Sequence, residues 1–211
     1  MRVRFSAAAG IPARTVSSRP SFASWRRTSL RRATTSPSTA VAQAERLPTG
    51  VPAVVVGDAV GAHAIRHRLR GLEAARLGFR WLGHMSDQEL LAQLWLNCAV
   101  YVHGHSVGGT NPALLQALGC GSPTLAVDTP FNREVLDGGG QDDQLVPAEA
   151  DVLSERLLAI LADGNRRQRL SSRGRAIVAE RYRWEDVCAA YRALLAGLAE
   201  RSRTVTPVGR A

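Results

Sequence analysis

The sequence predicts an α/β fold in which a parallel β-sheet carries helices on both faces. Short apolar runs rich in β-branched residues alternate with amphipathic helical segments between residues 51 and 128. Segments that alternate in this way form βαβ units, and right-handed crossovers make the strands of such units parallel. Beyond residue 128 the apolar spacing becomes helical, so C-terminal helices should follow the sheet.

Four strands are expected in this region. The stretch PAVVVGD at 52–58 is a β-branched run that ends at a glycine, as a buried parallel strand does. Three further runs have the same character: FRWLG at 79–83, AVYVHG at 99–104 and PTLAVD at 123–128. The intervals between these runs are long enough for the helical crossovers that parallel strands need.

The helices between the strands are marked by apolar residues that recur on one face. Ile65, Leu69 and Leu72 mark the first helix, at spacings of four and three. A Ser-Asp-Gln-Glu capping box at 86–89 begins the second, and Pro112 begins the third. Strands and helices in this order make a Rossmann-like core.

Three more helices are predicted after residue 128. Trp184 and Tyr191 are interpreted as packing residues that anchor the last of them. The apolar faces consist of Leu153, Leu157, Ile160 and Leu161 in the first, Leu170, Ile177 and Val178 in the second, and Val187, Tyr191, Leu194 and Leu198 in the third.

Residues 1–50 differ from everything after them. The first 44 residues contain eight arginines and no acidic residue, and they show no sustained period of 2 or 3.6. Residues 1–50 are therefore predicted to be a disordered tail. Two alternatives stay open: a translated stretch that is not the natural start of the domain, and an Arg- and Ser-rich organellar transit peptide. The folded domain is expected at 51–203, and 204–211 is expected to be a disordered C-terminus.

Most of the formal net charge of +9 arises from the tail. The chain has 27 basic residues, all arginine, and with eight of them in residues 1–44 the rest of the chain holds 19, against 18 acidic residues. A nearly neutral domain does not favour a groove that follows nucleic-acid phosphates, so no nucleic-acid partner is expected.

Cysteine content and hydropathy exclude two further classes of protein. Three widely spaced cysteines form neither a disulfide framework nor a zinc ribbon, and they indicate a reducing compartment. There is no run of about eighteen apolar residues, so no membrane span is expected, although peripheral membrane contact stays open. We expect a cytoplasmic protein.

The loop after the third predicted strand is the candidate ligand site, because ligands bind open parallel sheets at the carboxyl ends of the strands. In HSVGGTN at 105–111, Gly108 and Gly109 have no side chains, so their backbone amides can approach a ligand closely. Asn111 can cap the next helix, whose first residue is Pro112. Free amides and the positive end of a helix predict an anion-binding site, and phosphate is the commonest ligand of such sites.

The alternative for the same loop is a tight turn in which the glycines only permit unusual backbone angles. Ser106, Thr110 and Asn111 count against a simple turn, because they place three hydrogen-bonding side chains around one helix start. The anion site is therefore the favoured interpretation.

Five stretches of the chain carry a family resemblance: VVVGDA at 54–59, RWLGHMSDQELLAQL at 80–94, HGHSVGGTNP at 103–112, FNREVL at 131–136 and YRWEDVCAAY at 182–191. Together they resemble the donor-binding half of the GT-B-type retaining glycosyltransferases of family 4. Within that family the chain is most similar to the bacterial polysaccharide rhamnosyltransferase-like group. The resemblance runs from about Val54 to Arg201.

The resemblance implies an enzyme with two Rossmann-like domains, of which the second binds most of the nucleotide-sugar. It implies retaining transfer of a hexosyl group from a nucleoside-diphosphate sugar to a glycan or lipid-linked acceptor, in polysaccharide biosynthesis. The nucleotide-sugar is a substrate, and no cofactor is expected. A metal is not expected either, because His103 and His105 lack a third ligand at a suitable spacing.

The resemblance also assigns residues to the donor site. Gly108 and Gln116 stand where the family has the two carboxylates of a Glu-x7-Glu motif, and the second position faces the nucleotide ribose. An amide keeps one acceptor oxygen without the charge, so Gln116 predicts weaker donor binding. His105 and Ser106 are assigned to the leaving diphosphate, while Glu134 either approaches the donor or caps its own short helix. The diphosphate itself is expected against Ser106, Gly108, Gly109, Thr110 and Asn111.

Two parts of such an enzyme are not found in the sequence. The residues before Val54 do not show the pattern of a Rossmann-like, acceptor-binding domain. A pair of basic residues that would bind the diphosphate cannot be assigned either. The alternative function is therefore a truncated or degenerate donor domain that binds nucleotide without catalysis. A receiver-like domain would need acidic residues clustered after its first strand, where Asp58 stands alone.

Overall fold

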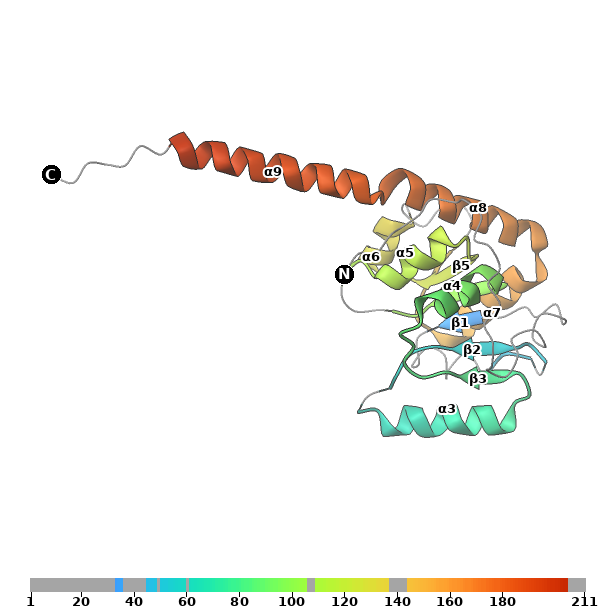
Figure 1. Ribbon diagram of the computed structural model, residues 1–211. Coiled ribbons are helices and arrows are strands. Elements are labelled where there is room, and N and C mark those ends of the chain that lie inside the picture. Colours follow the sequence, from blue (N-terminus) through green and yellow to red (C-terminus); the bar gives the residue numbers. More distant parts are fainter. Residues whose placement is uncertain are drawn as a thin grey trace. The chain divides into compact units, whose positions relative to one another are not determined.

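A computed structural model gives the protein an α/β architecture built on one six-stranded sheet (Figure 1). The described residues are 33–35, 45–48, 50–59, 61–105, 109–136 and 144–204. The chain divides into two compact units. The unit Thr28–Ala179 contains the sheet and its helices, and the unit formed by Met1–Arg27 with Glu180–Ala211 contains the last helix.

All strands of the sheet run parallel, in the order β3-β2-β1-β4-β5-β6. The order along the chain changes direction between β1 and β4. In an open sheet such a switch point leaves a crevice outside the carboxyl ends of the two strands, and ligands bind there. The strand bounds are β1 Ala33–Thr35, β2 Ala53–Val55, β3 Phe79–Trp81, β4 Val100–His103, β5 Thr124–Val127 and β6 Leu145–Val146.

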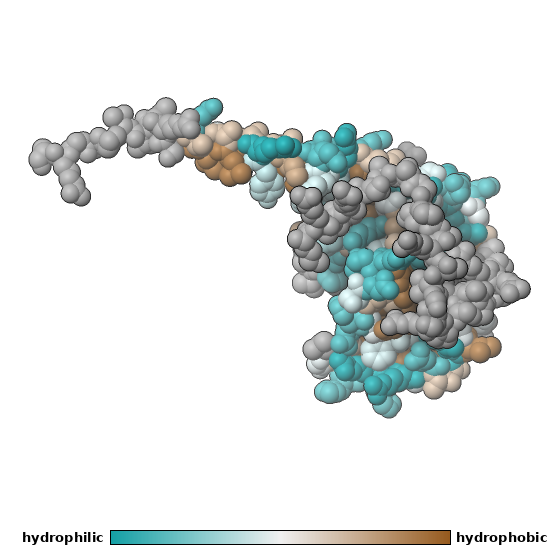
Figure 2. Space-filling view, viewed as in Figure 1, coloured by the Kyte–Doolittle hydropathy of each residue, from teal (hydrophilic) through white to brown (hydrophobic). Residues whose placement is uncertain are grey.

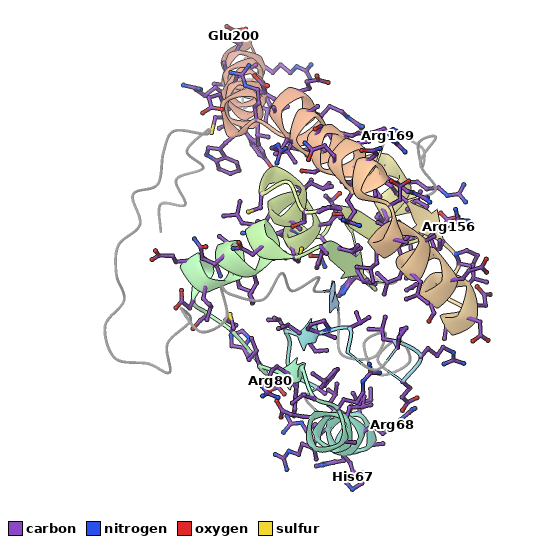
Figure 3. The ribbon with its side chains drawn as sticks, turned by 90° about the vertical axis from the view of Figure 1, so that its right-hand side faces the viewer. His67, Arg68, Arg80, Arg156, Arg169 and Glu200 are labelled. Carbon is purple, nitrogen blue, oxygen red and sulfur yellow. The ribbon has the colours of Figure 1, made fainter. Side chains whose placement is uncertain are left out.

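Helices cover both faces of the sheet. In Figure 3 the green helices α4 (Gln88–Asn97) and α5 (Pro112–Gly119) lie on one side of the strands, and α7 (Ala150–Ala162) lies on the other. Helix α3 (His63–Ala75) packs against β3, and the short α6 (Pro130–Val135) follows β5. The predicted α/β fold, with a parallel sheet and helices on both faces, is confirmed.

The hydrophobic core forms where α7 packs on the central strands. Val100 and Val102 of β4 and Leu125 of β5 are almost completely buried, and Leu153 and Leu157 of α7 join them in one cluster. Full burial of one such side chain contributes roughly 1.5–3 kcal/mol relative to exposure. The same core therefore holds β4 in place in the middle of the sheet.

Parts of residues 1–50, the segment predicted to be a disordered tail, belong to the described chain. Ala33–Thr35 forms β1, which pairs with β2 on one edge and β4 on the other. Leu47 is also buried. The described part of this segment therefore contributes a strand to the sheet and one residue to the hydrophobic core. The stretch ATT has no apolar run that would mark it as a strand, so only its pairing on both edges identifies it.

The remaining predictions for the two chain ends fall outside the described residues, at 1–32, 36–44 and beyond 204. Strand β6 was not expected from the sequence either. It has two residues, which is too short for an alternating or continuous apolar pattern to be recognised.

The last helix, α9 (Trp184–Thr204), carries apolar side chains on its surface (Figure 2). Within the described part of the chain, Trp184 and Tyr191 are 62% and 64% exposed. The prediction that they are packing residues is therefore wrong. The helix itself was expected, because the spacing of its apolar residues has a helical period. That spacing does not show which other segment, if any, packs against the apolar face.

A membrane-spanning helix would need a long and almost uncharged apolar stretch, and none of the helices in the described ranges has one.

Helix α8 (Gly164–Arg181) approaches α5 closely at a glycine. A Cβ built on Gly174 would lie 2.9 Å from Cδ2 of Leu118, a side chain that is fully buried. Such a distance is shorter than ordinary van der Waals contact. The absence of a side chain at position 174 therefore lets the two helices pack at their present separation.

We expect Gly174→Val to lower the free energy of unfolding by about 1–3 kcal/mol, because the added side chain overpacks the contact with Leu118. The matched control is Gly71→Val on α3, where a Cβ meets no atom within 4 Å. That control should change stability by less than about 0.5 kcal/mol. Urea unfolding followed by circular dichroism measures both. Equal midpoints for the two variants would contradict the tight contact.

Candidate functional site

Strand β4 carries the chain to the switch point beside β1. Its residues, Val100–His103, are all buried, since the strand pairs on both edges and helices cover both faces. Gly104 is still buried, and His105 is the first exposed residue. Ser106 and Gly108 lie outside the described residues, so their assignment to the site stays a prediction.

Three ring side chains follow one another toward the exposed end of this segment. The hydroxyl oxygen of Tyr101 and Nδ1 of His103 are hydrogen-bonded at 2.9 Å, and both side chains are buried. The ring centroids of His103 and His105 are 6.0 Å apart. Alternate residues of a strand share one face, which is why these rings form a row.

Burial controls the protonation of this row. It lowers the pKa of His103 from 6.5 to about 4, with a smaller contribution from His105, and it raises the pKa of Tyr101 above its usual range. At neutral pH His103 is therefore uncharged and Tyr101 keeps its proton. Nε2 of His103 is buried, and it has no hydrogen-bond partner among the described residues.

The start of α5 has the predicted cap. Asn111 has extended backbone angles, and its side-chain oxygen accepts a hydrogen bond from the backbone N–H of Ala113 at 2.9 Å. Pro112 occupies the first turn, where an N–H would have no partner. The prediction that Asn111 caps this helix is confirmed.

Three other backbone amides lie just before the first turn of α5. The N–H groups of Gly109, Thr110 and Asn111 donate to no protein acceptor within the described ranges. A Cβ on Gly109 would meet no described atom within 4 Å, so the space beside the loop is open. Amides at a helix N-terminus that have no intrahelical acceptor can bind an anion.

Glu134 is exposed on α6. The N-cap of that helix is Thr129, whose hydroxyl oxygen accepts from the N–H of Asn132 at 3.1 Å. The approach of Glu134 to a donor and its capping of its own helix both stay predictions.

Gln116 lies one turn into α5 from Pro112, and residues four apart share a helix face. Its side chain is half-buried and makes no hydrogen bond to another described residue. An amide in this state has its acceptor oxygen available for a ligand hydroxyl.

Sequence reasoning missed Asn132, although it belongs to the motif FNREVL. Its Nδ2 donates to the carbonyl oxygen of Val127 at 2.8 Å and to that of His105 at 3.3 Å. The side chain therefore joins the end of β5 to the residue that follows β4. One signal was available, because asparagine is unfavourable inside a helix unless its side chain finds another partner.

Carboxylates that follow two strands of the sheet, β2 and β5, are paired with arginines. After β2, Asp58 accepts from the N–H of Ala59 at 2.8 Å and from Arg66 at 3.0 Å. After β5, Asp128 forms a two-point pair with Arg133, which lowers the pKa of Asp128. The described residues contain no group of three or more His, Cys, Asp or Glu side chains that would hold a metal ion.

Comparison with known proteins adds to this geometry. The family model described as "Glycosyl transferases group 1" matches residues 39–177. Anabaena Alr3699/HepE in complex with UDP and glucose is similar, with a TM-score of 0.67 and 17% identity over 79% of this chain and 48% of that chain. The pneumococcal O-GlcNAc transferase GtfA in complex with UDP and GlcNAc has a TM-score of 0.59 and 18% identity, over 80% and 36%.

An isolated domain is also similar. The C-terminal domain of the group 1 glycosyl transferase LpcC from Francisella tularensis matches with a TM-score of 0.58 and 14% identity, over 73% of this chain and 87% of that chain. This chain spans about half the length of the Anabaena protein. No curated protein sequence matches it. At these identities, the solved structures establish the shared fold.

We predict that acidification destabilises the protein through His103. The pKa of this side chain is about 4 in the folded chain, against an ordinary value of 6.5. Between these values the unfolded chain binds the proton more readily, so stability falls as the pH falls from 6.5 to 4, by up to about 3 kcal/mol.

Urea unfolding at several pH values across this window measures the effect. His103→Gln should flatten the dependence on pH, because the residue that takes up the proton is removed. His84→Gln changes an exposed histidine and should leave the slope as it is. A slope unchanged by His103→Gln would show that another group is responsible.

Proposed function

Because the chain belongs to the glycosyl transferases group 1 family, we propose that it binds the nucleoside diphosphate of a sugar donor at the carboxyl end of β4. The observation that carries this proposal is a set of three amides, at Gly109, Thr110 and Asn111, which have no acceptor in the described part of the chain and lie beside open space at the switch point. Two similar structures contain UDP, which makes UDP the first probe.

The proposed reaction is transfer of a hexosyl group, with retention of configuration, to a glycan or lipid-linked acceptor. As the bond between sugar and diphosphate breaks, negative charge grows on the departing diphosphate. Fixed amides stabilise that charge without reorganising, and they act more strongly in the transition state than on the bound donor. His105, the first exposed residue after β4, adds a ring N–H at the same edge of the sheet. Ser106 and Gly108 belong to the same loop, and Glu134 is proposed to approach the donor from α6.

The finer assignment is to the rhamnosyltransferase-like group of family 4, acting in the cytoplasm in bacterial polysaccharide synthesis. The string HGHSVGGTNP at 103–112 supports this assignment. The nucleotide-sugar is the only small molecule that the proposed chemistry needs, and no metal is invoked.

A second candidate function is nucleotide binding without sugar transfer. Residues 36–44, which follow β1 in the sequence, contain no lysine or arginine. This segment would therefore supply no cation to a diphosphate. Nucleotide affinity without release of UDP or dTDP from any sugar donor would favour this second function. Release, with the product anomer identified by NMR, would favour the first.

We expect Gly109→Val to weaken UDP binding by about tenfold or more, equivalent to about 1.4 kcal/mol. The branched side chain would occupy the open space that the diphosphate needs. That space also means the fold should tolerate the substitution. Calorimetric titration with UDP measures the effect, and Gly71→Val serves as the control glycine away from the site. Undiminished binding would mean that the loop is only a turn.

We expect Gln116→Glu to tighten UDP binding several-fold, since a carboxylate accepts a stronger hydrogen bond from a ribose hydroxyl than an amide does. The gain should be smaller for dTDP, which lacks the 2′-hydroxyl. Gln168→Glu, an exposed position on α8, adds the same charge elsewhere as a control. An equal gain for both nucleotides would place the 2′-hydroxyl away from this residue.

A further inference from the structure

We propose that Asn132 is a positioning residue that holds His105 and the start of the ligand loop in place. This inference rests on the proposed function, because it concerns the same site. Asn132 lies on α6, 27 residues from His105 in sequence. Its Nδ2 lies 2.8 Å from the carbonyl oxygen of Val127 and 3.3 Å from that of His105. One side chain thus connects the end of β5 to the first residue exposed after β4.

The orientation of the Asn132 amide is fixed by its surroundings. Both contacts are carbonyl oxygens, which only accept hydrogen bonds, so the amide must present its nitrogen and its two N–H groups to them. The side chain is 3% exposed. Its backbone is held as well, since its N–H donates to the hydroxyl of Thr129. Asn132 therefore has little freedom to point elsewhere.

His105 has few other restraints. Its ring is exposed and makes no hydrogen bond to another described residue, and its ring contact is with His103 at a centroid distance of 6.0 Å. Within the described chain, the hydrogen bond from Asn132 is the one that restrains the His105 backbone. The restraint therefore comes from α6 and β5, and not from the loop itself.

This restraint sets where the loop 105–111 begins. The amides that contact a diphosphate must point toward the same place. Extra motion of the first residue of the loop therefore weakens all of these contacts at once. A nucleoside monophosphate makes fewer of these contacts. Loss of the restraint should therefore weaken binding of UDP more than binding of UMP.

The first test is NMR of the isotope-labelled full chain without ligand. Asn132→Ala should shift or broaden the backbone and ring signals of His105. The matched control is Gln144→Ala, which also removes a buried amide that donates to a strand carbonyl, that of Thr124, and has no hydrogen bond with His105 in the described chain. Unchanged His105 signals in Asn132→Ala, or equal changes in both variants, would overturn the proposal.

The second test is calorimetric titration of the same variants with UDP and UMP. Asn132→Ala should weaken UDP binding by about tenfold and UMP binding by about threefold or less, while Gln144→Ala should keep the wild-type ratio of the two affinities. Equal weakening for both nucleotides would indicate a purely structural role and overturn the proposal. If Asn132→Ala does not fold, Asn132→Ser keeps one donor in a smaller side chain and is measured in its place.

The two proposals fail in different ways. Wild-type protein that binds neither nucleotide would overturn the proposed function, and the role of Asn132 in ligand binding with it. The ligand-free signals of His105 would still decide whether Asn132 fixes that backbone. Wild-type protein that binds UDP, together with Asn132→Ala that keeps the wild-type affinities, would overturn only the role of Asn132.

Discussion

Strand β4 is hydrogen-bonded along both edges, to β1 and to β5, and all of its residues are buried. A strand in this position cannot slip by one residue, because the slip would turn every side chain to the opposite face of the sheet. The register therefore fixes where the strand ends and where His105 emerges. The reversal of strand order beside β4 opens the sheet at that same end, so the loop leaves β4 next to the crevice.

Side-chain amides at the strand ends decide which backbone groups remain for a ligand. Asn111 accepts from the first available N–H of α5, and Asn132 donates to one carbonyl beyond β4 and one at the end of β5. A buried backbone group left without a partner costs about 1–3 kcal/mol, so these contacts stabilise the fold. The N–H groups of Gly109 and Thr110 are different, because both residues are exposed and water can solvate them until a ligand arrives.

Two arginines that follow strands of the sheet are already paired with carboxylates. Arg66 and Arg133, the arginines near the ends of β2 and β5, are each paired with a carboxylate. Residues 36–44, after β1, contain no basic residue. A diphosphate in the proposed site would meet amide dipoles and His105, and Gln116 offers a neutral amide to its ribose. Such a site depends on the placement of dipoles more than on net charge, which makes restraints on the loop important.

Local patterns determined much of this protein from the sequence alone. Strands β2 to β5, the helix positions, the cap at Asn111 and the glycosyltransferase family all follow from features that lie within a few residues of one another. Side-chain period, capping residues and glycine act through neighbouring backbone, so a short window contains their information.

Only the tertiary structure decided the features that join distant segments. Ala33 pairs with Ala53 and Val100, and the stretch ATT has no apolar run that a local pattern could reveal. The contact of Asn132 with His105 likewise depends on β4 and β5 lying side by side. The exposed face of α9 shows the same limit, because amphipathic spacing gives a helix its apolar side and does not say what covers it. Hydrogen bonds and burial between remote residues exist only once folding has brought those residues together.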